Sequence, residues 1–231
     1  MAPYEALGEK YGVEFDFRPF YVIEPLSSAE FRSQHIELSS FTAVVFSSRF
    51  AIDAYFKLCG EYRFKVPETM KYFCTTELVA NYLQKYVVYR KRKIFFGDGT
   101  PESVAELVTP RHSSEKFLIA TSDLSNGLQY TNLLEAKNCE CKVGVLIKPV
   151  FQDLSQICLD SYEMIVLYNA NDVLSLKASF PDFKQGSIKF LAYGKGIVKA
   201  MEEAGLTACM QAPTPEIQSV VKALGLYLSQ Q

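Results

Sequence analysis

A series of strand-forming and helix-forming segments occurs twice in this chain and limits the folds open to it. TAVVFSSRFAIDAYF, which begins at Thr42, matches EMIVLYNANDVLSLKASF, which begins at Glu163. The second pair of matching segments is KYFCTTELVANYLQKY and KFLAYGKGIVKAMEEAGL. The third pair is GDGTPESVAELV and APTPEIQSVVKAL. The three offsets are 121, about 118 and 114 residues. Because the order is kept at a similar spacing, we predict two copies of one strand–helix unit.

Short apolar runs rich in Val, Ile and Phe alternate with helical patterns along the chain. Such an alternation is typical of parallel sheets that are covered by helices on both faces. The predicted fold is therefore α/β, with two similar lobes, each a parallel sheet flanked by helices, and a cleft between them. The predicted strands cover residues 42–47, 71–75, 93–96, 116–121, 141–147, 162–168, 188–194 and 208–213.

The tripeptide Thr-Pro-Glu occurs at Thr100 and again at Thr214, each time before an apolar pattern of helical spacing. Thr is a good N-cap residue, Pro fits the first helical position, and Glu suits the positive end of the helix dipole. Both copies are therefore predicted to begin a helix.

The composition excludes several classes of protein. The 231 residues are 48% hydrophobic and 22% charged, which is enough apolar material to fill real cores. A formal net charge of −2 argues against a general nucleic-acid binder. No apolar run is long enough for a membrane span, and the amino-terminal residues do not resemble a signal peptide. The six scattered cysteines are expected to be reduced in a cytoplasmic protein.

Ligands of open parallel sheets bind at the carboxyl ends of the strands. This rule directs attention to five loops, which cover residues 47–49, 75–76, 121–122, 169–171 and 194–196.

The order of these motifs resembles the uroporphyrinogen-III synthase family. The resemblance rests on the strand that ends in Phe-Ser-Ser at Ser48, the strand that enters a helix at Gly194, and the APTPE segment near the carboxyl end. The most specific stretch is IKFLAYGKGIVKAMEEAGL (188–206), which is similar to the family's I-x-x-A-I-G-P-T-T-A-x-A-L-x-x-x-G-L. The resemblance covers nearly the whole chain.

The resemblance implies a lyase of tetrapyrrole (heme) biosynthesis. Members of this family close linear hydroxymethylbilane to uroporphyrinogen III, lose water, and invert ring D through a spiro intermediate. The resemblance also implies that the protein uses no cofactor and no metal. It further implies a cytoplasmic monomer that binds neither nucleic acid nor a membrane. It implies a discontinuous first lobe, residues 1–21 plus 152–231, and a second lobe of residues 22–151.

The substrate carries many carboxylates, which helix N-termini and hydroxyl groups can bind with few cations. The resemblance places substrate-binding residues at Ser47, Ser48, Thr75, Thr76, Asn169, Lys189, Gly194, Lys195 and Gly196. For Ser47 and Ser48, capping of the following helix is an equal alternative to binding. For Lys189, a solvated lysine beside a strand is an equal alternative. No residue is predicted as a catalytic acid or base.

The sequence departs from the family pattern at several positions. Ile147 occupies the place of a tyrosine, Asn169-Ala170 replaces Ser-Pro, and Gly196 and Ile197 replace two threonines. The family's arginine after the first strand of the middle lobe falls at Phe50, one residue after Arg49. The sequence also opens inside the family's first helix, without the short apolar strand that precedes it, and a misassigned start codon is favoured over a real loss of that strand.

Two other functions remain open at this stage. One is a non-catalytic relative that binds a tetrapyrrole or another polycarboxylate, which the departures favour. The other is a two-lobed binding protein for a small metabolite, which needs only the fold. Cys139 and Cys141 lack a second cysteine pair or a nearby histidine, so we predict structural cysteines rather than a metal site. Neither His35 nor His112 is assigned a role.

Overall fold

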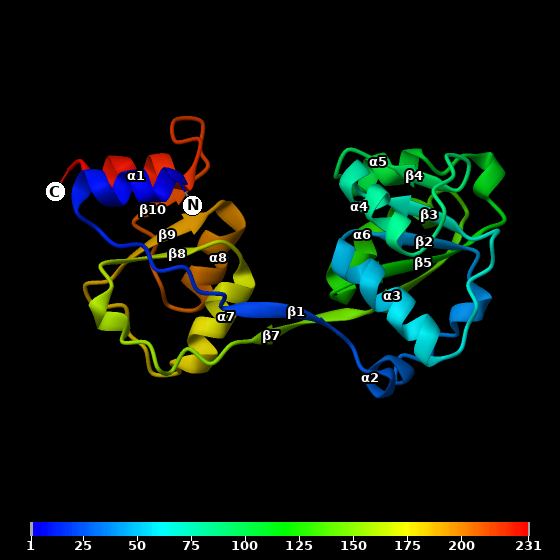
Figure 1. Cartoon of the computed structure of the whole chain (residues 1–231), viewed down its shortest axis with the longest axis horizontal. Helices are drawn as coiled ribbons and strands as arrows, with labels where there is room; N and C mark the ends of the chain where they lie inside the picture. The colour runs from blue at the N-terminus through cyan, green and yellow to red at the C-terminus, as the bar shows by residue number, and fades with distance from the viewer. Residues whose placement is uncertain (1, 231) are drawn as a thin grey trace. The chain divides into compact units, whose positions relative to one another are not determined.

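Parallel strand pairing organises both halves of the chain (Figure 1). The computed structural model describes residues 2–230 and divides the chain into two units. Unit 1 combines the residues up to Val22 with those from Val150 onward, and unit 2 runs from Ile23 to Pro149. Each unit has its own sheet and its own cores, so each is an α/β body in itself.

Unit 2 contains a five-stranded sheet in the order β4-β3-β2-β5-β6, and every pair in it is parallel. The central strand is β2, in which Val44 lies opposite Tyr72 of β3 and Leu118 of β5. All four residues of β2 are buried, because helices cover both faces of the sheet. The strand bounds are Ala43–Phe46 (β2), Lys71–Cys74 (β3), Ile94–Phe96 (β4), Lys116–Thr121 (β5) and Glu140–Val145 (β6).

The helices of unit 2 fill two cores, one on each face of the sheet. Phe46 packs with Ile52 and Leu58 of α3 on one face, and Phe117 packs with Leu134 of α6 on the other. The predicted helices on both faces are therefore confirmed. The helix bounds are Ser28–Arg32 (α2), Arg49–Glu61 (α3), Glu77–Tyr82 (α4), Pro101–Glu106 (α5) and Leu124–Glu135 (α6). Single 3₁₀ turns cover Leu38–Ser40, Leu83–Lys85 and Pro110–His112.

Helix α6 approaches β6 closely at Gly127. A Cβ atom at Gly127 would lie 2.3 Å from Cγ1 of Val143, which no real side chain tolerates. A glycine at this position therefore sets the spacing between α6 and the edge of the sheet.

Unit 1 repeats the first three strands of unit 2. Its sheet has the order β10-β9-β8, all parallel, which matches β4-β3-β2. The start of β8 lies 121 residues after that of β2, and the start of β9 lies 118 residues after that of β3, as the duplication predicts. The bounds are Met164–Leu167 (β8), Lys189–Tyr193 (β9), Met210–Ala212 (β10), Ala2–Tyr11 (α1), Ala170–Ser179 (α7), Lys195–Glu203 (α8) and Val220–Leu228 (α9), with a 3₁₀ turn at Leu159–Ser161.

Two cores flank the sheet of unit 1. Leu167 and Phe190 pack with Leu176 of α7 and Met201 of α8 on one face. Leu191 packs with residues of α9 on the other, and Leu7 of α1 joins that cluster. The amino-terminal helix is thus packed in the same unit as the carboxyl-terminal helix.

The segments that connect the units pair with each other as a two-stranded sheet of β1 (Tyr21–Pro25) and β7 (Ile147–Phe151). The predicted strand 141–147 is therefore wrong at its end, because β6 stops at Val145 and Ile147 begins β7. The physical reason is that the backbone changes its hydrogen-bonding partner at Leu146. The N–H of Leu146 still donates to Thr121 of β5 (2.9 Å), while its carbonyl accepts from Leu26 (2.8 Å).

The second Thr-Pro-Glu does not begin a helix, which corrects that prediction. Thr100 caps α5, with Pro101 at its first position, but α9 begins only at Val220, with Ser219 as its cap. Thr214 accepts from the N–H of Ile217 (3.0 Å) as a cap would, yet its own N–H donates to the carbonyl of Ile217 (2.7 Å). This closed loop turns Ile217 toward the core beside α9, and tertiary packing overrides the local helix signal.

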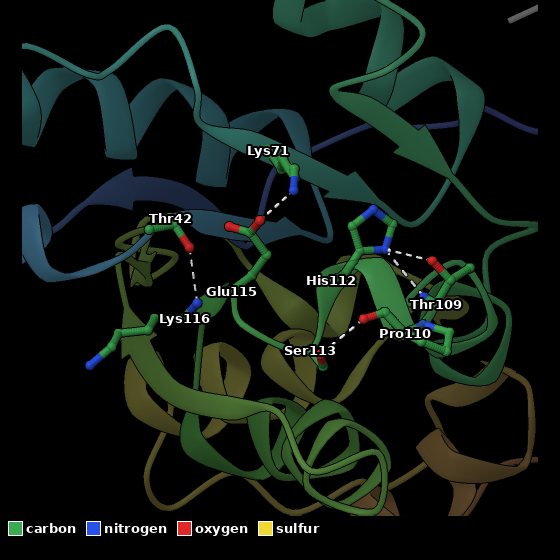
Figure 2. Close-up of polar contacts among 8 residues, drawn as sticks. All are labelled: Thr42, Lys71, Thr109, Pro110, His112, Ser113, Glu115 and Lys116. Carbon is green, nitrogen blue, oxygen red and sulfur yellow. Dashed lines mark hydrogen bonds and ion pairs between the residues drawn. The ribbon is translucent and has the colours of Figure 1, made fainter.

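A polar network ties the amino ends of three strands of unit 2 together (Figure 2). Lys71 at the start of β3 forms an ion pair with Glu115, and the N–H of Lys116 donates to Oγ1 of Thr42 (3.0 Å). Beside them, buried His112 meets the rings of Phe73 and Phe95 edge-on, with centroid distances of 5.3 and 5.1 Å.

His112 also accepts a hydrogen bond through Nδ1 from the N–H of Thr109 (3.2 Å; Figure 2). Burial, and next the charge of Lys71, lower the pKa of His112 from its ordinary value of 6.5. The folded protein therefore holds the neutral imidazole, which is the form that accepts from Thr109. His112 supports the structure of unit 2, at the end of the sheet opposite to the carboxyl ends of the strands.

We predict that His112 makes folding stability pH-dependent. Because the folded pKa is lowered, this contribution is present above the unfolded pKa of about 6.5 and is lost as the pH falls toward the folded pKa. Melting temperatures of the wild type and of His112→Gln, which does not titrate, should be compared between pH 5 and pH 7.5. The wild type should lose more stability than the variant on acidification, and a constant difference across this range would contradict the prediction.

Candidate functional site

Four of the predicted site residues of unit 2 lie together at the carboxyl ends of adjacent strands. Ser47 and Ser48 follow β2, and Thr75 and Thr76 follow β3, which pairs with β2. The hydroxyl of Thr75 donates to the carbonyl of Ser47 (3.2 Å), so the two loops are in direct contact.

Two of these hydroxyl groups cap helices. Oγ of Ser48 accepts from the N–H of Ala51 at the start of α3 (3.2 Å), and Oγ1 of Thr76 accepts from Val79 in α4 (3.3 Å). Thr75 is buried, whereas Ser47 is exposed and its hydroxyl has no hydrogen-bond partner within residues 2–230. Ser47 is therefore the hydroxyl of this group that is most open to a ligand.

The carboxyl ends of β8 and β9 in unit 1 carry four more of the predicted residues. Asn169 follows β8, where its amide oxygen accepts from Asn171 (2.8 Å) and its amide nitrogen donates to the hydroxyl of Tyr21 (2.8 Å). Gly194 follows β9 with a φ of +89°, a conformation that favours glycine. It begins α8 without any side-chain cap, which leaves the N-terminal N–H groups of that helix beside exposed Lys195 and Gly196.

The structure does not bring Lys189 to this group. Lys189 begins β9 and Gly194 follows the end of that strand, so they lie about 16 Å apart along it. Arg49 is exposed at the start of α3, with its guanidinium 5.8 Å from the centre of the Tyr82 ring.

Exposed apolar side chains accompany these loops, and the sequence reasoning missed them. In unit 2 they are Phe50, Leu78 and Leu124, each within the first turn of a helix that follows a strand. Leu78 is 80% exposed. The signal was present in the sequence: Phe50 and Leu78 each come two residues after a capping hydroxyl, at Ser48 and Thr76, where a side chain points away from the sheet.

A pair of tyrosines marks the same edge in unit 1. Tyr168 and Tyr193 directly follow β8 and end β9, each is 45% exposed, and their ring centroids are 5.6 Å apart. The hydroxyl of Tyr168 lies 3.0 Å from that of Tyr4. Partial burial, and next the contact with Tyr4, raise the pKa of Tyr168, so the phenol is protonated at neutral pH and can donate a hydrogen bond.

Asp172 is the buried carboxylate of this edge. It accepts from the N–H groups of Tyr168 (2.7 Å) and Asn169 (3.0 Å), and burial raises its pKa. Both contacts hold the loop after β8 in place. Asp172 therefore supports the edge rather than facing a ligand.

The polar groups at these edges could bind anions next to apolar rings. N-terminal N–H groups, hydroxyls and Lys195 suit carboxylates, and exposed aromatic and aliphatic side chains suit flat apolar groups. Residues 2–230 contain no group of three or more His, Cys, Asp or Glu side chains placed to hold a metal ion. Cys139 is buried and Cys141 half-buried, and burial raises the pKa of both thiols, to about 11 for Cys141. No helix within the same residues is long and apolar enough to cross a membrane.

Both units belong to the class of open parallel α/β folds, in which helix N-termini lie at the carboxyl ends of the strands and ligands bind at that edge. The family model for Uroporphyrinogen-III synthase HemD matches residues 2–222, and the chain belongs to this family. A search of curated proteins finds no significant match.

Solved structures of this family share the fold. A mutant uroporphyrinogen III synthase from the extremely thermophilic bacterium Thermus thermophilus is 15% identical, with a TM-score of 0.56 over 99% of this chain and 94% of the other. Uroporphyrinogen-III synthetase from Helicobacter pylori 26695 is 16% identical, with a TM-score of 0.58 over 92% of this chain and 91% of the other. The predicted α/β fold class is thereby confirmed.

The adjacent residues Ser47 and Ser48 allow the capping role and the binding role of a hydroxyl group to be tested separately. Ser48→Ala should lower the free energy of unfolding by about 1 kcal/mol, because it removes the cap of α3. Ser47→Ala should change it by less than about 0.5 kcal/mol, because no partner is lost. Urea unfolding of both variants measures this, and an equal loss in the two would contradict the assignment.

Proposed function

We propose that this chain is an active uroporphyrinogen-III synthase, a lyase of heme biosynthesis in the cytoplasm. It would close hydroxymethylbilane to uroporphyrinogen III with inversion of ring D. The observation that carries the proposal is the placement of helix N-termini beside exposed apolar side chains at the strand ends of a chain that belongs to this family. Units 1 and 2 would correspond to the two lobes of the family's fold.

The substrate's carboxylates would bind where positive charge and open donors meet. At the start of α8, free N–H groups and Lys195 supply both, and Gly196 leaves the approach open because no atom lies within 4 Å of a Cβ placed there. In unit 2, Ser47 and the first turns of α3 and α4 would bind further carboxylates. The exposed rings and aliphatic side chains would contact the pyrroles.

The proposed reaction needs little acid–base chemistry from the protein. The hydroxyl group of the hydroxymethyl carbon takes up a proton and leaves as water, and the substituted carbon of ring D attacks the carbon left behind, which gives a spiro intermediate. This intermediate reopens and closes with ring D inverted, and the closing carbon of ring D releases a proton, so that one water is lost overall. Hydroxymethylbilane also closes by itself without inversion. The residues of the two edges would therefore act by holding a conformation in which the substituted carbon is the one that attacks.

A second candidate is a non-catalytic relative that binds a tetrapyrrole or another polycarboxylate. Its specific support is Ile147, which stands where the family pattern has tyrosine. Ile147 is 5% exposed and packs in the core of unit 2, so it offers no hydroxyl to a ligand. Asn169, which replaces a serine, already uses its amide for the cap of α7 and for Tyr21.

Fresh hydroxymethylbilane tests the two candidates directly. The purified chain should give uroporphyrinogen III above the background of isomer I that buffer alone produces, measured after oxidation by separation of the isomers. Isomer I alone, together with saturable binding of a tetrapyrrole, would support the non-catalytic relative instead. Isomer I without binding would reject both.

The tyrosine pair gives a sharper test of the site. Tyr168→Ala and Tyr193→Ala should each lower kcat/KM for isomer III by about tenfold, since a ring contact or a hydrogen bond to a charged group contributes about 1–2 kcal/mol. Tyr168→Phe keeps the ring and removes the donor, so it separates the two effects. Tyr89→Phe in unit 2, away from both edges, is the matched control. Unchanged isomer ratios in both alanine variants would remove the pair from the site.

A further inference from the structure

A cavity of about 430 Å³ lies within unit 2, on the face of the sheet that α3 covers. Its volume falls within the roughly 300–1,000 Å³ of typical small-molecule sites. Tyr72 of β3 and Ile94 of β4 line it, together with Phe56 and Cys59 of α3. None of the candidate residues in the loops after β2 and β3 lines it, so this cavity is separate from the candidate site and independent of the proposed function.

The walls of this cavity are mainly aromatic and aliphatic. The rings of Phe56 and Tyr86 stack, with centroids 4.4 Å apart and an angle of 5° between their planes. The ring of Tyr72 lies 6.5 Å from that of Phe56. Met70 and Ile94 add aliphatic surface. Such walls suit a flat apolar group, because aromatic rings pack well on surfaces of this kind.

Asp53 holds the Tyr86 part of the wall in place. Its carboxylate accepts hydrogen bonds from the hydroxyl of Tyr86, from that of Tyr82 (2.8 Å) and from Nζ of Lys85 (2.9 Å). Asp53 belongs to α3, as Phe56 does, so Tyr86 is joined to that helix through both its ring and its hydroxyl. The protein's own side chains therefore fix this wall, and a preformed wall lowers the cost of binding.

Tyr72 brings an unpaired hydrogen-bond donor to the cavity. It is only 4% exposed, and its hydroxyl makes no hydrogen bond within residues 2–230. Unlike the hydroxyl of Tyr55, it is not sealed from solvent. Burial, and next the neighbouring Cys59, raise the pKa of Tyr72, so the phenol is protonated at neutral pH and can donate. A ligand with an acceptor atom would supply the partner that this donor lacks.

Positive charge gathers beside Tyr72 at the start of β4. Arg90 and Lys93 line the cavity, and Ile94, which follows Lys93, lies opposite Tyr72 in the sheet. Nζ of Lys93 donates to the carbonyl of Glu68, whereas the guanidinium of exposed Arg90 has neither an ion pair nor a hydrogen bond within residues 2–230. The lining carries these two cations and one carboxylate, that of Glu68, so its charge favours an anion.

We propose that this cavity binds a small aromatic carboxylate. The flat apolar body would lie against the wall of Phe56 and Tyr86, and the carboxylate would pair with Arg90 and accept a hydrogen bond from the hydroxyl of Tyr72. A guanidinium can bind a carboxylate through two parallel hydrogen bonds, which makes it the stronger of the two donors. The Arg-Lys-Arg-Lys run at residues 90–93 would add attraction for an anion.

The test titrates the full chain with 2-naphthoate as the ligand. We expect saturable binding with a Kd of about 0.1–1 mM, which is the range for a ligand of this size. The amide chemical shifts of Val87, Val88 and Ile94, measured by NMR, should move along the same saturation curve, because these residues line the cavity. No movement of these shifts at about ten times the expected Kd would overturn the proposal.

Matched variants separate this site from a general attraction of anions to the basic run. Tyr72→Phe should weaken binding by about tenfold and Arg90→Gln by about fivefold, because each removes a donor to the carboxylate. Arg92→Gln removes the same charge from a side chain outside the cavity, so the Kd should stay within about twofold. Equal losses in the two arginine variants would overturn the proposal.

Two analogues of the ligand test its chemical class. 2-Naphthylmethanol keeps the rings but carries no charge, and it should bind at least about fivefold more weakly than 2-naphthoate. 2-Naphthylmethylammonium carries the opposite charge and should bind more weakly still. Binding of the alcohol or of the ammonium ion as tight as that of the carboxylate would overturn the choice of an anionic ligand.

Discussion

Parallel strand pairing in the sheets of units 1 and 2 dictates how each unit is built. Parallel neighbours cannot be joined by a tight turn, so each strand must be followed by a crossover, which here is a helix. The helices cover both faces of each sheet, and β2 is buried along its whole length for that reason. Its four side chains are apolar, and they are found at the centre of unit 2.

The same constraint places the candidate site. When every strand is followed by a helix, the helix N-termini gather at the carboxyl ends of the strands, and their free N–H groups face the same edge. In unit 2 the hydroxyls of Ser48 and Thr76 accept hydrogen bonds from such N–H groups. In unit 1, by contrast, α8 begins at Gly194 without a side-chain cap. Uneven capping therefore leaves the N–H groups at the start of α8 more open than those at the starts of α3 and α4, and the start of α8 lies beside the exposed ring of Tyr193.

Unit 1 is the smaller copy, and its elements depart further from the predicted strand–helix series. Its sheet keeps three of the five strand positions, and the third helix of its series starts at Ser219 rather than at the second Thr-Pro-Glu. The later start of α9 arises where the amino-terminal segment packs against the carboxyl-terminal half, because Leu7 and Phe15 join the same core as Ile217 and Leu224. The local helix signal of the second Thr-Pro-Glu loses there to the packing of segments that are distant in sequence.

The sequence alone predicts the strand–helix alternation, the duplication and some of the capping residues, because these depend on short-range patterns that a few neighbouring residues define. It predicted β2, β3, β8 and β9 to within about two residues, and it placed Ser48, Thr76 and Gly194 at helix starts. Two other features had to come from the tertiary structure: Ile147 leaves the sheet for β7, and Tyr168 and Tyr193 stand side by side. These properties depend on which distant segments pair and pack together, and no local pattern carries that information.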